Sequence, residues 1–86
     1  MTIQSETKQK PALTLRDGTV SIAIWANTTK EGVFYKAQPL RSYKTKDDQW
    51  KETDSFSQTD LLKLSRLIEN AYGEIAALRE RDKLEK

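Results

Sequence analysis

Apolar side chains occupy every second position in the stretch VSIAIWA, residues 20–26. This period-two alternation and the enrichment in β-branched residues predict a β-strand, because successive side chains of a strand point to opposite faces of its sheet. Val20, Ile22 and Ile24 belong to one apolar face, so Trp25 points to the opposite face. The chain is therefore expected to form a sheet with one buried face and to place a large aromatic side chain on the other.

Turn signals on both sides of this strand predict three further strands. Asp17-Gly18 predicts a tight turn before it, because glycine adopts positive φ without steric cost. The polar loop 28–32 and the polar stretch 45–48 separate the later strands. The expected strands cover residues 12–16, 19–27, 33–44 and 49–56. Four consecutive strands joined by short loops are expected to form an antiparallel meander.

The pairing of the second and third strands decides which aromatic side chains share a face. Pairing Asn27 with Val33 across the polar loop places Tyr35 opposite Trp25. The same register places two apolar side chains of the third strand on the buried face: Phe34 and Leu40. It also turns two polar side chains of that strand inward: Lys36 and Gln38. Pro39 cannot donate a ladder hydrogen bond, so we expect a bulge or an edge position there.

The fourth strand brings further aromatic and charged residues next to the third. We expect it to pair with Lys44 opposite Gln49. The resulting cross-strand pairs are Tyr43–Trp50 and Arg41–Glu52. Glu52 and Asp54 then lie on the same face as Arg41, and we expect ion pairing with Arg41 to be their role.

The C-terminal third of the chain has the pattern of one long amphipathic helix. Ser57 is a good N-cap with Asp60 three residues later, a variant of the capping box. Apolar residues then recur at steps of three and four, as in a single stripe of a helix. The stripe consists of Leu61, Leu64, Ile68, Ala71, Ile75 and Leu78. Leu67 widens one flank of this stripe. Leu62 lies well off the stripe and is a candidate for contact with a second chain.

Together these elements predict an α+β fold: a four-stranded antiparallel β-meander followed by one long C-terminal helix that packs on one face of the sheet. Residues 1–10 are polar and aperiodic and are expected to form a flexible arm. The ββββα domain is expected to cover residues 11–78, and residues 79–86 to form a charged helical tail. One helix covers one face, so the other face of the sheet stays open.

The composition excludes most enzyme classes. The 86 residues contain no Cys and no His, which excludes disulfides, thiolate or imidazole catalysis and the usual zinc sites. We expect a non-enzymatic protein with no metal site and no cofactor. No apolar run approaches the roughly 18 residues that span a bilayer, so we expect no membrane association and a cytoplasmic location.

The open face of the predicted sheet gathers aromatic and basic side chains. The candidate nucleic-acid-binding residues on it are Trp25, Tyr35, Arg41, Tyr43 and Trp50. Lys44 and Lys51 are further candidates, and they lie near the edges or turns, as Arg16 does. Aromatic rings stack on the bases of a single strand, and cations follow its phosphates. Because 15 Lys+Arg against 13 Asp+Glu give a net charge of only +2, such binding depends on which face the charges occupy. Two other interpretations stay open: the aromatic pairs stabilise the hairpins, or the face binds a protein.

The order of elements and two short matches resemble a known single-stranded DNA-binding fold. The segment LRDGTVSIAIW, residues 15–25, combines an Arg-Asp turn with a strand of the form VxIxI. The segment TDSFSQTDLLKLSRLIENAY, residues 53–72, runs from a strand through a polar cap into the helix. In this layout the chain resembles the positive cofactor four and Whirly families over residues 12–78. The resemblance implies homodimers joined through the C-terminal helices, with grooves on the strands that take unpaired DNA.

The chain is also similar to a group of small uncharacterised bacterial proteins, often carried on mobile elements. These proteins have an RDG turn, an RSYK strand end and a WK…DSFS run. The matching segments here are Arg16-Asp17-Gly18, Arg41-Ser42-Tyr43-Lys44 and Trp50-Lys51. This second resemblance informs the fold more than the role.

The leading hypothesis from the sequence is a non-enzymatic protein that binds single-stranded nucleic acid, as a regulator of transcription or replication, and forms a homodimer through its helix. The alternative is a protein-interaction module that uses the same face, such as a phage- or plasmid-borne modulator of a host protein.

Overall fold

The computed structural model describes residues 10–84. The strands, in chain order, are β1 (Leu13–Asp17), β2 (Val20–Thr29), β3 (Gly32–Lys44) and β4 (Trp50–Thr53). They form an antiparallel sheet in the order β1-β2-β3-β4, and the helix α2 (Gln58–Leu84) follows them. The predicted α+β fold, a four-stranded meander with one long C-terminal helix, is confirmed. The predicted flexible arm, residues 1–10, lies outside the described residues except for Lys10.

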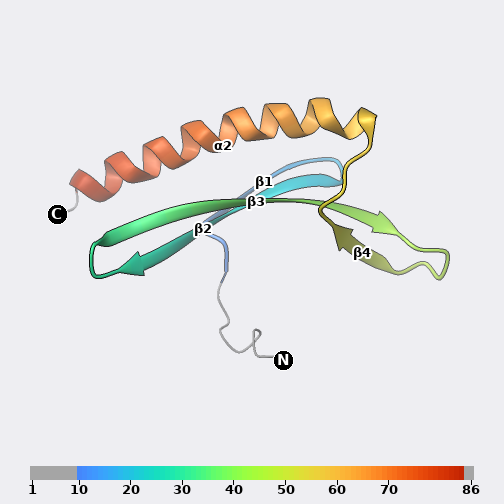
Figure 1. Ribbon diagram of the computed structural model, residues 1–86, viewed down its shortest axis with the longest axis horizontal. Helices are drawn as coiled ribbons and strands as arrows, with labels where there is room; N and C mark the ends of the chain where they lie inside the picture. Colours follow the sequence, from blue (N-terminus) through green and yellow to red (C-terminus); the bar gives the residue numbers. More distant parts are fainter. Residues whose placement is uncertain (1–9, 85–86) are drawn as a thin grey trace.

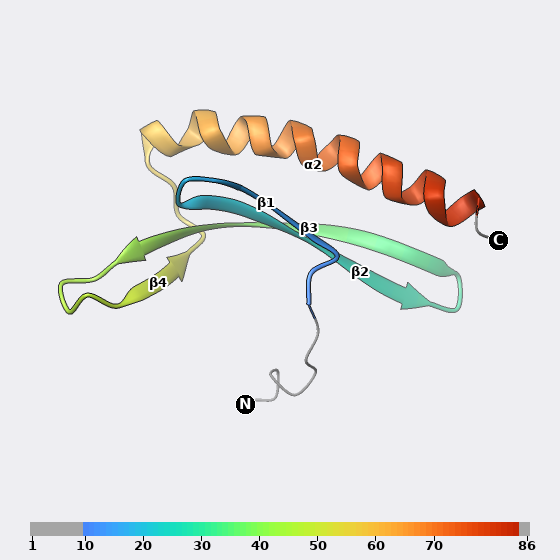
Figure 2. The ribbon, with the colours of Figure 1, turned by 180° about the vertical axis from the view of Figure 1, so that it is seen from behind.

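β2 and β3 form a long curved ribbon that runs the length of the molecule, and α2 lies along one side of it (Figures 1 and 2). The outer strands are shorter than this ribbon. β1 pairs with the first half of β2, and β4 pairs only with the end of β3, residues 41–44. The ribbon therefore extends beyond both outer strands, and its turn lies beneath the C-terminal end of α2.

The core lies between the sheet and α2. Val20, Ile22 and Ile24 on β2 are almost fully buried, as their alternation predicted, and they pack against Leu67 and Ala71 of the helix. Partly buried apolar residues surround this centre: Leu13, Leu15, Tyr35, Phe56, Leu64, Ile75 and Leu78. The core is small because α2 packs mainly on β1 and β2 and only lightly on β3.

The buried side of α2 differs from the predicted stripe. Leu67, which lies outside the predicted stripe, is 5% exposed and belongs to the core, whereas Leu61 and Ile68 are each 51% exposed. The apolar arc of the helix is wider than the strip that contacts β1 and β2, and the sheet determines which part of the arc is covered. Leu62 and Tyr72 are also exposed. The flank with Leu61, Ile68 and Tyr72 is thus apolar and uncovered, and Leu62 lies beyond it around the helix.

The turn between β2 and β3 is shorter than the predicted loop. Thr29 pairs with Gly32, so only Lys30 and Glu31 lie between the strands. The Thr29 hydroxyl accepts a hydrogen bond from the Glu31 backbone N–H at 3.1 Å, and Gly32 has a φ of 132°, which glycine tolerates best. The predicted register, with Asn27 opposite Val33, is therefore wrong by one residue.

This shift reverses the two faces of β3. Trp25 pairs with Lys36, and Tyr35 pairs with Ala26 on the side of the helix. Phe34 and Leu40 move to the open face, together with the two side chains that the predicted register had turned inward, Lys36 and Gln38. Pro39 takes an ordinary position opposite Ile22. The register is continuous from Thr29 to Val20, so the described strands have no bulge near Pro39. The expected edge position is present, because β4 pairs only with residues 41–44 and leaves the other side of Pro39 without a strand from residues 10–84.

The pairing of β3 with β4 is also shifted by one residue from the prediction. Lys44 pairs with Trp50, and Arg41 lies opposite Thr53. The expected Arg41–Glu52 and Tyr43–Trp50 pairs are therefore wrong. The β2–β3 register and the β3–β4 register are each shifted by one residue from the prediction, so the side chains of β4 return to their predicted faces. Trp50 therefore lies on the open face, as Trp25 does.

The predicted cap at the start of α2 is present. The Asp60 carboxylate accepts hydrogen bonds from the Ser57 hydroxyl at 2.8 Å and from the Ser57 backbone N–H at 3.1 Å. This contact satisfies a backbone donor just before the first helical turn. At its other end α2 continues to Leu84, so the predicted charged tail is part of the helix as far as the described residues reach. Within those residues, no helix is long and apolar enough to cross a membrane.

Candidate binding face

The face of the sheet opposite α2, called the open face below, carries aromatic and basic side chains. By strand alternation and the observed registers, its aromatic residues are Trp25, Phe34 and Trp50. Its basic residues are Arg16, Lys36 and Lys44. Among the paired residues of the described strands, Glu52 is the one carboxylate on this face. The paired positions of the open face therefore carry three basic side chains against one carboxylate.

Two of the aromatic residues lie together at the hairpin end of the ribbon. Trp25 pairs with Lys36, and the next pair on the same face is Asn27 with Phe34. Diagonal neighbours on one face are within reach of aromatic side chains. Phe34 is 50% exposed and Trp25 is partly exposed. This end of the face presents accessible rings with an adjacent ammonium group.

The third aromatic residue lies at the other end of the sheet. Trp50 is 62% exposed and pairs with Lys44, whose Nζ lies 5.9 Å from the centre of the Trp50 ring. Lys44 also approaches the Asp48 carboxylate at 3.6 Å, but both side chains are at least half exposed, so this ion pair contributes little. Trp50 and Lys44 can therefore rearrange to contact a ligand at small cost.

Side chains between these two ends are mostly small. Ser21 and Ala23 occupy the open face of β2, Thr14 lies on β1 beside Ala23, and Ser42 lies on β3. Arg16 is next to Ser21. On β3 the middle of this face also carries the larger side chains Gln38 and Leu40. The low part of the face therefore lies over β1 and β2, with a cation at its edge.

The structure divides the predicted binding residues between the two faces. Trp25, Lys44 and Trp50 share the open face, whereas the others lie on the side of α2: Tyr35, Arg41, Tyr43 and Lys51. The prediction that Tyr35, Arg41 and Tyr43 share one face with Trp25 and Trp50 is wrong, because the one-residue shift reverses the faces of β3.

Tyr35 has a structural role on the helix side. It packs against the core, and its hydroxyl donates a hydrogen bond of 2.5 Å to the Asp82 carboxylate on the last turns of α2. That hydrogen bond, with a smaller effect of burial, raises the pKa of Tyr35. The contact ties the C-terminal end of the helix to the ribbon.

Arg41 holds the other end of α2. Its Nε donates to the Ser55 carbonyl at 2.9 Å and lies 3.4 Å from the Asp60 carboxylate. Its guanidinium is also 5.8 Å from the centre of the Tyr43 ring. Arg41 therefore joins β3 to the start of the helix, and this role replaces the expected ion pair with Glu52.

The sequence interpretation missed two residues of the open face, Phe34 and Lys36. A signal for them was present. A register that turns two polar side chains into a core contradicts the hydrophobic pattern, and a one-residue shift removes that conflict. The two-residue loop between Thr29 and Gly32 is also the commonest hairpin length.

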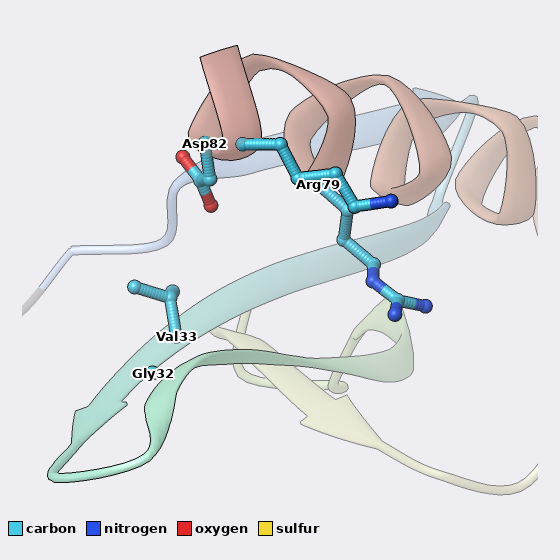
Figure 3. A pocket seen from close by; sticks show the side chains of 5 residues that line it. Gly32, Val33, Arg79 and Asp82 are labelled. Atoms are coloured by element: carbon cyan, nitrogen blue, oxygen red, sulfur yellow. The ribbon is translucent and has the colours of Figure 1, made fainter. Parts of the chain in front are cut away.

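Hollows in the surface lie on the helix side. An apolar groove of about 360 Å³ runs between α2 and β3, lined on the sheet by Ala37 and Pro39 and on the helix by Ile68, Tyr72 and Ile75. A smaller pocket of about 240 Å³ lies at the hairpin end, where Arg79 and Asp82 project from the helix toward Val33 and Gly32 (Figure 3). No group of three or more His, Cys, Asp or Glu side chains within residues 10–84 could hold a metal ion.

Comparisons with protein-family models, with curated proteins and with solved structures found no match to this chain. The geometry of the two faces therefore carries the functional argument.

Proposed function

We propose that this protein is a non-enzymatic, cytoplasmic binding protein for single-stranded nucleic acid, as a regulator of transcription or replication, and that it acts through the open face. One observation carries this proposal: three aromatic and three basic side chains share the sheet face that the helix leaves uncovered. The binding residues proposed here are Arg16, Trp25, Phe34, Lys36, Lys44 and Trp50.

The chemistry of this face suits an unpaired strand. Stacking of a base on an aromatic side chain contributes roughly 1–3 kcal/mol and depends little on sequence, while Lys and Arg side chains follow the phosphates. A duplex hides the faces of its bases in its own stack, so the exposed aromatic rings of this face would find no base faces to stack on. The open face thus favours single strands.

A titration with fluorescein-labelled oligo-dT, at low and at raised salt, tests the proposed function. We expect micromolar or tighter binding that weakens as salt increases, because bound cations release counterions from the strand. Trp25→Ala should weaken binding about 5- to 150-fold, the equivalent of one lost stacking interaction. Tyr43→Ala is the matched control, because this aromatic side chain lies on the helix side, and it should bind like wild type.

The absence of salt-sensitive binding would contradict this function and would favour a second candidate, a protein-interaction module such as a phage- or plasmid-borne modulator of a host protein. The apolar groove between α2 and β3 is the specific observation in its favour, since exposed apolar surfaces of this kind mark protein contacts.

We also propose that the protein forms a homodimer through α2. The exposed flank of the helix contains Leu61, Ser65, Ile68, Tyr72 and Ala76, which recur at steps of three and four and carry no charge. Tyr72 is 80% exposed, although it borders the apolar groove. Depletion of charge together with an exposed aromatic residue is typical of the centre of an interface. A second copy that packs along this flank would leave both open faces accessible.

A further inference from the structure

We propose that the open face holds two separate base-stacking stations and therefore selects single strands long enough to reach both. The first station is Trp25 with Phe34 at the hairpin end, and the second is Trp50 at the β3–β4 end. This inference rests on the proposed function, since it specifies the strand that the open face accepts.

The registers set the distance between the stations. Trp25 pairs with Lys36 and Trp50 pairs with Lys44, so eight residues of β3 separate the two positions. At a rise of about 3.3 Å per residue, this spacing corresponds to about 26 Å along the strand. One base, or two neighbouring bases, cannot contact both stations.

The surface between the stations does not continue the stacking. On β3 the intervening open-face residues are Gln38, Leu40 and Ser42, and on β2 they are Ala23 and Ser21. Within the described strands this middle zone has no aromatic ring. Arg16 lies beside Ser21, and its guanidinium can contact a phosphate of the bound nucleic acid. We therefore expect the protein to hold the middle of a bound nucleic-acid strand by its phosphate backbone and the two ends of that strand by their bases.

Two linked weak contacts give a length threshold. A short oligonucleotide binds one station at a time, whereas a longer one makes the second contact intramolecular, which can increase the affinity 10²- to 10⁴-fold. A stacked strand advances about 3.4 Å per nucleotide and spans about 26 Å with about eight nucleotides, and a more extended strand needs fewer. We therefore place the threshold between about four and eight nucleotides, within the range of site sizes known for single-strand-binding surfaces.

A length series of oligo-dT, from three to sixteen nucleotides, tests the threshold by fluorescence anisotropy. We expect the affinity to increase at least tenfold between about four and eight nucleotides and to change little beyond that length. Trp50→Ala should remove this step, because it leaves the open face with one stacking station. Tyr43→Ala, on the other face of the same hairpin, should keep the step.

A second measurement uses the wild-type protein alone and so does not depend on the folding of a variant. In a twelve-nucleotide oligo-dT, abasic sites in the middle four positions should leave the affinity within about threefold of the intact strand. Abasic sites at both ends should weaken binding at least tenfold.

The outcomes separate the two proposals. Affinity that increases smoothly with length, or equal losses from middle and terminal abasic sites, would overturn the two stations while leaving nucleic-acid binding in place. Failure to bind oligo-dT of any length would overturn the proposed function itself.

Discussion

Asp60 illustrates how one side chain joins two elements of this protein. Its carboxylate accepts hydrogen bonds from the Ser57 hydroxyl and backbone N–H, and it lies 3.4 Å from the Arg41 Nε on β3. These interactions favour the ionised carboxylate, chiefly through the two hydrogen bonds with Ser57, so the pKa of Asp60 in the folded protein is lowered. One carboxylate therefore caps α2 and ties it to the sheet.

The lowered pKa predicts a specific pH dependence of stability. Unfolding releases Asp60 to its ordinary pKa near 4, so its stabilising effect is complete above that pH and is lost as the pH falls through the lower folded value. We expect Asp60→Asn to be less stable than wild type at pH 7, and the difference to shrink below about pH 4. Urea unfolding of both proteins from pH 7 to pH 2.5 measures this difference. A difference in unfolding free energy that stays constant from pH 7 to pH 2.5 would contradict the stabilising role of the ionised Asp60 carboxylate.

At this scale, the sequence predicted local contacts better than distant ones. The Ser57–Asp60 cap was predictable because both residues lie within one turn of chain, where spacing fixes geometry. The partner of Arg41 was not predictable, because it depends on a pairing register that is set far from Arg41 along the chain, at the turn between Thr29 and Gly32. The roles of Tyr35 and Arg41 at the two ends of α2 could be seen only once that register was known.

At the scale of elements, α2 contains a weak point in Gly73. Glycine within a helix is less favourable than alanine by about 1 kcal/mol. A Cβ placed on Gly73 has no described heavy atom within 4 Å, so the added methyl group meets open space. The helix should therefore tolerate the substitution sterically.

We expect Gly73→Ala to increase the free energy of unfolding by about 0.5–1 kcal/mol, measured by urea denaturation. Gly32→Ala is the contrasting variant, because its φ of 132° is strained for any residue with a Cβ. It should lower stability by about 1–3 kcal/mol. A destabilising Gly73→Ala would contradict the open surroundings of that residue.

The sequence predicted all of these elements, and their order, because each has a strong periodicity and clear turn residues. It did not predict how they are aligned. The loop 28–32 was read as five residues, whereas Thr29 and Gly32 continue the strands and leave a two-residue turn. This difference shifts the pairing register of β2 and β3 by one residue. A one-residue shift moves every side chain of a strand to the opposite face, so Phe34 lies on the open face in place of Tyr35.

At the scale of the whole molecule, the apolar surface of α2 is wider than the part of it that the sheet covers. The helix packs mainly on β1 and β2, while Ala37 and Pro39 of β3 line an apolar groove beside Ile68 and Tyr72. The width of an apolar arc is visible in a sequence, but its division between core and surface depends on where the helix lies. The core position of Leu67 and the exposure of Ile68 show that division.

The proposed homodimer predicts a defined response to charge on this flank. Wild type should sediment at twice the chain mass of 9.9 kDa at micromolar concentration, and Tyr72→Glu should sediment as a monomer, because it places a carboxylate in the apolar contact. Leu62→Glu is the matched control: Leu62 is 76% exposed but lies off the flank, so this variant should remain dimeric. A wild-type protein that is monomeric at all concentrations tested, by analytical ultracentrifugation, would rule out the dimer.

The short β4 leaves the outer edge of β3 without a neighbouring strand from Gly32 to Leu40, among the residues described. An unpaired strand edge of this kind can form backbone hydrogen bonds with another chain and so start amyloid-like aggregation. Pro39, which has no backbone N–H, and the charged Lys36 interrupt this edge as gatekeepers against such growth. Pro39, at an edge position of β3, thus helps to keep the ribbon from aggregating.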